Sequence, residues 1–130
     1  MFISHVTIKN YRNFGDPPFE IDLKPLTLIL GENNIGKTNL ISALGLIFSQ
    51  EITVFRKRIL DIDDINYSAI KRFKKSICDL SIKPEDVQFP EVRIDVKLTG
   101  MTDEQKAIVG EWAVNALITE AQLTYQFAPK

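Results

Sequence analysis

The sequence predicts an α/β fold with α+β character, built around a phosphate-binding loop between a strand and a helix. Residues 26–30 form a continuous apolar run, which is typical of a strand covered on both faces. Residues 31–38 match the pattern G-x-x-x-x-G-K-[ST], and a helical pattern runs from residue 38 to about residue 49. Residues 92–98 and 121–127 alternate apolar and polar side chains, which indicates half-buried antiparallel strands. We therefore expect mixed and antiparallel strands around the helix that follows the loop.

The composition is that of an ordinary globular domain. The chain has 130 residues, 45% hydrophobic and 25% charged, and a net charge of -1, so nothing global indicates a nucleic-acid coat or a membrane surface. A single cysteine, Cys78, and a single histidine, His5, exclude an internal disulfide, a cysteine-based zinc site and a multi-histidine metal site. No signal-peptide pattern is present, and no apolar run approaches the roughly 20 residues of a membrane span. We expect a soluble, cytoplasmic protein.

Two more strands are predicted before the loop. Residues 2–9 alternate apolar and polar side chains over most of their length, as expected of a strand. Residues 10–18 contain glycine and two prolines and predict a turn-rich connection. Residues 19–23 alternate again and predict a second strand, which Pro25 ends.

The helix after the loop has an apolar stripe that we expect to face the core, made of Leu40, Ile41, Leu44, Ile47 and Phe48. Residues 50–65 predict an irregular loop with a short strand at its start. A second helix then runs to about residue 79, with either Asn66 or Ser68 as its cap.

A third helix is predicted near the end of the chain. Thr102 and Gln105 form a capping-box pattern that opens it. The apolar positions that follow are expected to be buried, and they are Ile108, Val109, Trp112, Ala113, Ala116 and Leu117.

The loop at residues 31–38 carries the chemistry of the chain. Gly31 and Gly36 permit backbone torsions that let successive N–H groups point at phosphate oxygens. The helix that follows directs the positive end of its dipole to the same place. Lys37 is expected to reach the β- and γ-phosphates of ATP, and the Thr38 hydroxyl is expected to bind Mg²⁺. The sequence thus predicts a Walker A site for ATP and Mg²⁺.

A second motif narrows the class of protein. The predicted first strand ends in Lys9-Asn10-Tyr11-Arg12, and the loop continues as far as Asn39 in the form N-N-x-G-K-T-N. The combination resembles the N-terminus of the AAA/ABC ATPase heads of RecF, SMC and OLD proteins, and most closely the OLD-type ATP-dependent endonucleases. The specific motifs cover residues 1 to about 50.

The resemblance implies roles for particular residues. In that family the arginine that matches Arg12 lies near the nucleotide, and the asparagine that matches Asn33 lies near the γ-phosphate. A loop glutamine also helps to hold Mg²⁺, but the spacing in this chain selects no particular glutamine. The expected cofactor-binding residues are Arg12, Gly31, Asn33, Asn34, Ile35, Gly36, Lys37, Thr38 and Asn39, with Thr38 as the metal ligand.

The resemblance also implies that residues 1–130 are the N-terminal lobe of an ABC-type head. No run of about four apolar residues ends in an acid, so a Walker B motif is missing, and an ABC signature before a helix is missing too. In the family the signature comes from a second head, with ATP between the two heads of a homodimer. We therefore expect the lobe to bind ATP without efficient hydrolysis, and we leave its catalytic residues unassigned.

Three functions remain open at this point. The resemblance implies a whole protein that is an ATP hydrolase and a metal-dependent DNA endonuclease, with a C-terminal Toprim domain and a partner protein in antiviral defence. A RecF- or SMC-like DNA repair ATPase head is the second interpretation. The third is an assembly module that binds nucleotide and never hydrolyses it.

Other polar clusters have two interpretations each. The basic cluster Lys71, Arg72, Lys74 and Lys75 either contacts DNA phosphates or is a solvated helix face. The acidic cluster Asp61, Asp63 and Asp64 fits a solvated loop better than a metal site, because no other ligands accompany it.

Overall fold

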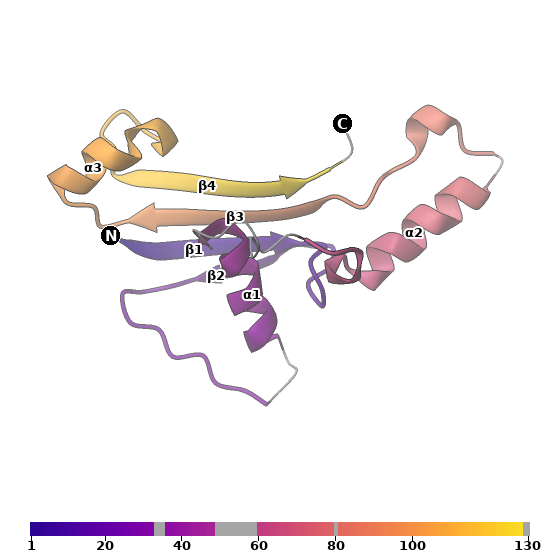
Figure 1. Cartoon of the computed structure of the whole chain (residues 1–130), viewed down its shortest axis with the longest axis horizontal. Coiled ribbons are helices and arrows are strands. Elements are labelled where there is room, and N and C mark those ends of the chain that lie inside the picture. The colour runs from indigo at the N-terminus through magenta and orange to yellow at the C-terminus, as the bar shows by residue number, and fades with distance from the viewer. Residues whose placement is uncertain (33–35, 49–59, 80, 129–130) are drawn as a thin grey trace.

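The computed structural model describes residues 1–32, 36–48, 60–79 and 81–128 (Figure 1). In this part of the chain, four strands form one antiparallel sheet in the order β2-β1-β3-β4. They are β1 (Phe2–Lys9), β2 (Phe19–Asp22), β3 (Val92–Thr99) and β4 (Glu120–Phe127). The strands predicted from the alternating segments are confirmed, including the antiparallel pairing of β3 with β4.

The register of the sheet places the apolar positions of neighbouring strands on one face. Val6 of β1 lies opposite Ile21 of β2 and Val96 of β3, and Val96 lies opposite Leu123 of β4. Because side chains alternate across a strand, this register buries Val6, Val96 and Ile94 completely. Each such burial stabilises the fold by about 1.5–3 kcal/mol.

Helix α1 (Lys37–Phe48) covers this apolar face, and Leu40 and Ala43 join the core of the sheet. The predicted stripe is wrong at Ile41 and Phe48, which are 70% and 42% exposed. The helix instead faces the core through positions spaced by three and four residues, and Ile41 lies about 100° away from Leu40 around the axis. Ser42 is buried on a different side of the helix.

Helix α2 (Tyr67–Cys78) lies beyond the edge where β1 ends and β3 begins (Figure 1). Its cap is Asn66, whose side chain accepts a hydrogen bond from the backbone N–H of Ser68 at 3.0 Å. Before it, a 3₁₀ turn η1 (Ile62–Asp64) replaces part of the predicted irregular loop. The short strand expected at the start of residues 50–65 lies outside the described residues.

Helix α3 (Asp103–Val109) opens at the predicted capping box of Thr102 and Gln105. It ends earlier than predicted and continues only as a 3₁₀ turn, η3 (Gly110–Trp112). Beyond η3, Ala113 forms an isolated antiparallel β-bridge with Ala121 of β4. The chain at Ala113 therefore runs beside β4 and does not continue the helix. The expected burial is therefore wrong at the exposed residues Ile108, Trp112, Ala116 and Leu117, and only Val109 of this helix is buried.

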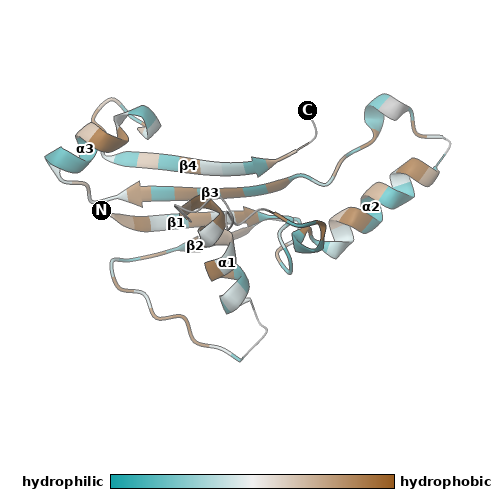
Figure 2. Ribbon diagram, in the orientation of Figure 1, coloured by the Kyte–Doolittle hydropathy of each residue, from teal (hydrophilic) through white to brown (hydrophobic). Residues whose placement is uncertain are grey.

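Residues 26–30, predicted as a buried strand, form an extended segment that pairs with none of the four strands. Leu26 is 91% exposed, and Leu28 and Leu30 are each 80% exposed. Figure 2 shows this apolar connection lying away from the sheet, between β2 and α1. A strand needs a neighbour for its N–H and C=O groups, and the described residues provide none here.

None of the helices in the described ranges is long and apolar enough to cross a membrane.

Candidate functional site

The turn after β1 has an unusual backbone. Asn10 and Arg12 have positive φ values of 55° and 48°. Asparagine adopts this left-handed region readily, whereas arginine does so only where surrounding contacts hold it. The backbone N–H of Phe14 closes the turn on the carbonyl of Tyr11 at 2.9 Å, and Tyr11 is completely buried. The turn is therefore held at the edge of the hydrophobic core, and this holds Arg12 at a defined position.

Within the described residues, Arg12 donates four hydrogen bonds. Its backbone N–H donates to the carbonyl oxygen of Asp64, and its Nε donates to Oδ1 of Asp64, both at 2.7 Å. One terminal nitrogen donates to Oδ1 of Asn39 at 3.0 Å and to Oγ of Ser42 at 3.4 Å. The hydrogen bond with Asp64 raises the pKa of Arg12, and partial burial opposes this effect. The guanidinium therefore stays charged beside the first turns of α1.

Asn66 fixes the same turn to α2. Its Nδ2 donates to the carbonyl oxygen of Arg12 at 2.7 Å, and its backbone N–H donates to the carbonyl oxygen of Asn10 at 2.9 Å. The same side chain caps α2 through Ser68. A single asparagine thus connects the arginine turn to the start of the second helix.

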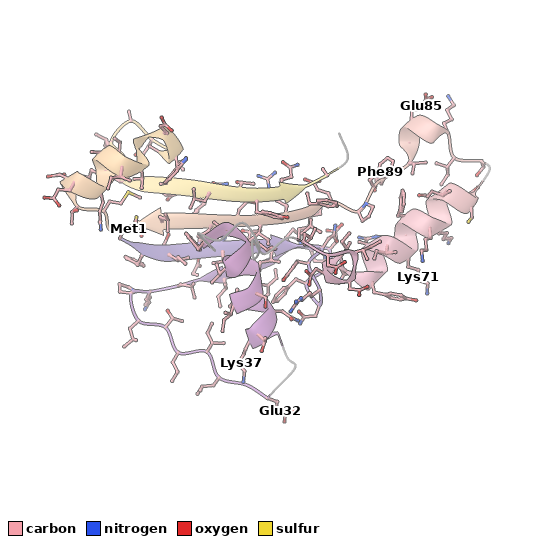
Figure 3. The ribbon with its side chains drawn as sticks, viewed as in Figure 1. Met1, Glu32, Lys37, Lys71, Glu85 and Phe89 are labelled. Atoms are coloured by element: carbon pink, nitrogen blue, oxygen red, sulfur yellow. The ribbon has the colours of Figure 1, made fainter. Side chains whose placement is uncertain are left out.

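The phosphate-binding loop ends where α1 begins. Gly36 has a φ of 122°, and a Cβ atom there would lie 2.8 Å from Nδ2 of Asn13 and 3.4 Å from Cζ of Phe14. Only glycine fits this position without strain. The Nζ of Lys37 donates to the carbonyl oxygen of Gly31, so the lysine spans the two ends of the loop. Figure 3 shows Lys37 on the side of α1 that faces Glu32.

The structure brings most of the predicted site residues together. Thr38 lies in the first turn of α1, and Asn39 donates from Nδ2 to Oδ1 of Asn13 at 2.7 Å while it accepts from Arg12. The predictions for Asn33, Asn34 and Ile35 lie outside the described residues. The described part of the expected site therefore surrounds the N-terminus of α1.

Four supporting residues were not predicted, and they are Asn13, Ser42, Asp64 and Asn66. Asp64 lies 52 residues from Arg12 and was interpreted as part of a solvated loop. Its side chain is only 13% exposed. The Asp61 and Asp64 side chains also form a capping box around η1, a local sequence signal that marks Asp64 as ordered.

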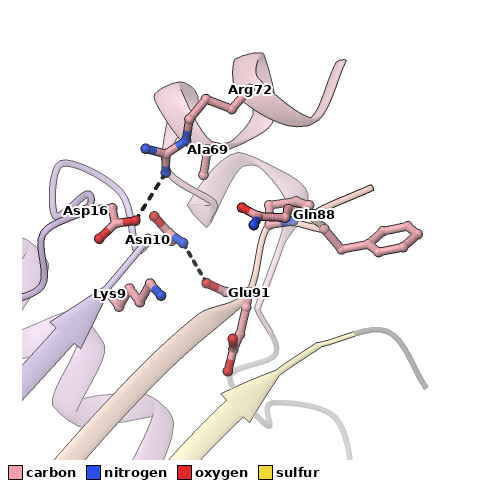
Figure 4. Close-up of a pocket in the computed structure, with 9 residues that line it drawn as sticks. Lys9, Asn10, Asp16, Ala69, Arg72, Gln88 and Glu91 are labelled. Carbon is pink, nitrogen blue, oxygen red and sulfur yellow. Dashed lines mark hydrogen bonds and ion pairs between the residues drawn. The ribbon is translucent and has the colours of Figure 1, made fainter. Parts of the chain in front are cut away.

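One cavity lies beside the predicted phosphate loop, and another lies beside α2. One of about 170 Å³ lies beside the loop and is mainly apolar, with Phe14, Phe19, Leu30, Gly36 and Lys37 among its lining residues. A polar cavity of about 420 Å³ lies at the base of α2 (Figure 4). Asn10, Arg72 and Glu91 are among the residues that line it, and none of the described residues of the predicted phosphate loop does. The larger cavity is therefore separate from the described residues of that loop.

The chemistry of the site is that of anion binding. Gly36 and the free N–H groups in the first turn of α1 provide donors, and Lys37 adds a cation beside them. Within the described ranges, no group of three or more His, Cys, Asp or Glu side chains is placed to hold a metal ion. A hydroxyl such as that of Thr38 suits Mg²⁺ when phosphate and water provide its other ligands.

The fold and this site define the N-terminal lobe of a P-loop ATPase head of the ABC type. Comparison with protein families places residues 1–125 in the AAA ATPase domain family, and the chain belongs to that family. The predicted fold class is thereby confirmed.

Several relatives match a part of the chain. Endonuclease GajA of Bacillus cereus (strain VD045) is 44% identical over 55 residues, which are 42% of this chain and 9% of that protein. DNA replication and repair protein RecF of Rickettsia felis is 42% identical over 48 residues, which are 37% of this chain and 13% of that protein. RecF of Bacillus cytotoxicus is 48% identical over 44 residues, which are 34% of this chain and 12% of that protein. The matched regions are therefore small parts of much longer proteins.

A solved structure shares the fold. It comes from work described as "Structural biochemistry of ATP-driven dimerization and DNA stimulated activation of SMC ATPases". The TM-score is 0.59 at 15% identity, and the match covers 99% of this chain and 64% of the other. At this level of identity the likeness shows that the two chains share a fold.

Proposed function

We propose that this lobe binds Mg-ATP at residues 31–39 and forms one half of an ATP site in a longer ATPase. The observation that carries the proposal is the geometry of Lys37, which starts α1 and donates back to the carbonyl oxygen of Gly31. In that position the ammonium group lies between Gly31 and the N-terminus of α1, where backbone N–H groups can donate to an anion. A bound phosphate chain replaces the Gly31 carbonyl as its partner.

The residues around the loop then have distinct tasks. The N–H groups from Gly36 onward bind phosphate oxygens, and Lys37 neutralises their charge. Thr38 holds Mg²⁺ by its hydroxyl, and the ion withdraws charge from the phosphates when it is bound. Arg12 is fixed by Asp64 and Asn39 and adds a permanent positive charge beside the first turns of α1. Asn33, Asn34 and Ile35 complete the loop.

Hydrolysis needs parts that the described lobe does not provide. A complete ABC-type ATP site also needs a catalytic acid and the ABC signature motif. We propose that a second copy of the head provides the signature motif in a homodimer. The relative GajA is named an endonuclease, and RecF is named a DNA replication and repair protein. Both names support a whole protein that acts on DNA in the cytoplasm.

We favour an OLD-like endonuclease with a role in antiviral defence, together with a partner protein. The N-N-x-G-K-T-N loop and the match with GajA support it. A RecF-like repair ATPase is the second candidate, because several RecF proteins match this chain at 40 to 48% identity over 44 to 48 residues. A module that binds nucleotide without hydrolysis is the third.

One experiment on the whole protein separates these candidates. ATP hydrolysis and DNA cleavage are measured with Mg²⁺ and duplex DNA, for the wild type and for Lys37→Ala. The endonuclease proposal expects both activities in the wild type and loss of hydrolysis in the variant. Hydrolysis without cleavage indicates a RecF-like ATPase. If the wild type binds ATP but never hydrolyses it, the hydrolase proposal fails.

A further inference from the structure

Helix α2 has an uneven distribution of charge. Its 12 residues include Lys71, Arg72, Lys74 and Lys75 and no Asp or Glu. The whole chain is nearly balanced, with 16 basic and 17 acidic residues. All four basic side chains are exposed. Figure 2 shows hydrophilic and hydrophobic bands alternating along this helix.

Three of the basic residues share one face. Lys74 and Lys75 follow Lys71 at three and four positions, so the three side chains lie within an arc of about 100°. Ala69 and Phe73 lie on the opposite side, where Ala69 is buried and the Phe73 ring lies 5.0 Å from that of Phe89. Figure 3 shows Lys71 and Phe89 on opposite sides of the helix. The lysine face is therefore directed away from the body of the lobe.

In the described part of the chain, the positive charges of this face are not neutralised by ion pairs, although the charge of Lys75 helps to lower the pKa of Asp79. Arg72 turns to the flank of the helix, where it lies 3.8 Å from a carboxylate oxygen of Asp16 (Figure 4). Among the ion pairs of the described residues, none involves Lys71, Lys74 or Lys75. Like charges at these spacings destabilise a helix. A bound polyanion offsets this cost.

An aromatic side chain extends the same face. Tyr67 precedes Lys71 by one turn and is 76% exposed. Its hydroxyl group can donate to a phosphate oxygen, as tyrosine often does at nucleic-acid backbones. An interfacial membrane helix, in contrast, needs a free apolar face, and Phe73 on the apolar side of α2 already packs on Phe89. The face thus suits a phosphate backbone better than a lipid surface.

We propose that the face of α2 formed by Tyr67, Lys71, Lys74 and Lys75 binds the phosphate backbone of duplex DNA. The inference rests on the proposed function only in that the whole protein acts on DNA. Lysine ammonium groups are point charges that bind phosphates without reading bases. The contact is therefore independent of sequence and sensitive to salt.

The test compares two triple variants of the full chain with equal change of charge. The first is Lys71→Gln, Lys74→Gln and Lys75→Gln. The control is Lys24→Gln, Lys97→Gln and Lys106→Gln, at positions after β2, on β3 and on α3. Glutamine has a helix propensity close to that of lysine, and circular dichroism checks the fold. The affinity for a duplex of random sequence is measured by fluorescence anisotropy between about 50 and about 200 mM salt.

We expect the α2 variant to bind at least about tenfold more weakly and the slope of log K against log salt to fall by about 2 to 3. The control should change affinity less than about threefold. A third variant, with arginine at the three α2 positions, should retain affinity because it keeps the charge. The inference is overturned if the α2 variant equals the wild type, if the control loses as much, or if the wild type binds anionic vesicles but not DNA.

Calorimetry with Mg-ATP on the same proteins separates this inference from the proposed function. Neither triple variant changes the phosphate loop, so both should bind Mg-ATP as the wild type does. Failure of the wild type to bind Mg-ATP contradicts the proposed function and leaves the DNA result to decide the inference on α2.

Discussion

Arg12 and Asp64 are joined twice, from backbone to backbone and from side chain to side chain, each time at 2.7 Å. The two contacts hold Arg12 at a φ of 48°, a conformation that arginine rarely adopts. They also connect the turn after β1 to the 3₁₀ turn that precedes α2. Asp64 is therefore a positioning residue for the arginine beside the phosphate loop.

Replacing Asp64 with alanine should lower the free energy of unfolding by about 1–3 kcal/mol. The substitution leaves the Arg12 guanidinium without its charged partner in a partly buried position. The matched control is Asp63→Ala, an exposed neighbour in the same 3₁₀ turn, which should change stability by no more than about 0.5 kcal/mol. The free energy of unfolding of the wild type and of the two variants is measured by urea denaturation. Equal stability of both variants would show that the Arg12 contact contributes little.

Replacing Gly36 with alanine should cost about 1–3 kcal/mol of stability and weaken nucleotide binding. The new Cβ atom would meet Asn13, and the φ of 122° suits only glycine. Gly110→Ala is the control, because Gly110 has helical torsions and nothing lies within 4 Å of an added Cβ. That control should be neutral or more stable by up to about 1 kcal/mol. Thermal unfolding that shifts equally for both variants would contradict the role given to Gly36.

The stability of the sheet should depend on the ionisation of Asp95. Burial alone would raise the pKa of Asp95, but hydrogen bonds from Arg93, Thr124 and Gln122 and the charge of Arg93 together lower it. A lowered folded-state pKa contributes stability that is complete above the unfolded value of about 3.9 and is lost as pH falls through the folded value.

The measurement is the free energy of unfolding of the wild type and of Asp95→Asn as a function of pH. At pH 7 the variant should be less stable by about 1–2 kcal/mol, because charged hydrogen bonds are lost. The difference should begin to shrink as pH falls below the unfolded value of about 3.9, and it should be lost as folded Asp95 takes up a proton at its lower pKa. A difference that stays constant down to about pH 2 would mean that the Asp95 carboxylate is not stabilised in the folded state.

Much of the fold could be predicted from the sequence because its signals are local. Alternation with a period of two marked the four strands, and the capping box at Thr102 marked the start of α3. The phosphate loop could be predicted for the same reason, since its glycines, Lys37 and Thr38 lie within one short segment of the sequence. Arg12 was found through its motif, and the structure brings it to Asn39.

The predictions were wrong or incomplete where contacts between distant parts of the chain determine the structure. The run from Leu26 to Leu30 has the composition of a buried strand, but in the described structure no strand pairs with it. The predicted third helix extends past Gly110, whereas the chain turns there to bring Ala113 to β4. Asp64 and Asn66 could not be assigned to the site, because their contacts with the arginine turn span 52 and 54 residues.

Isothermal calorimetry of the full chain with Mg-ATP tests the central claim, that this lobe binds nucleotide through Lys37. The wild type should bind, and Lys37→Ala should lose at least about 2 kcal/mol of binding free energy, because a charged contact with phosphate is removed. Lys97→Ala, on β3 and paired with Glu120, serves as the control and should bind as the wild type does. Equal affinity of the wild type and Lys37→Ala would contradict the claim.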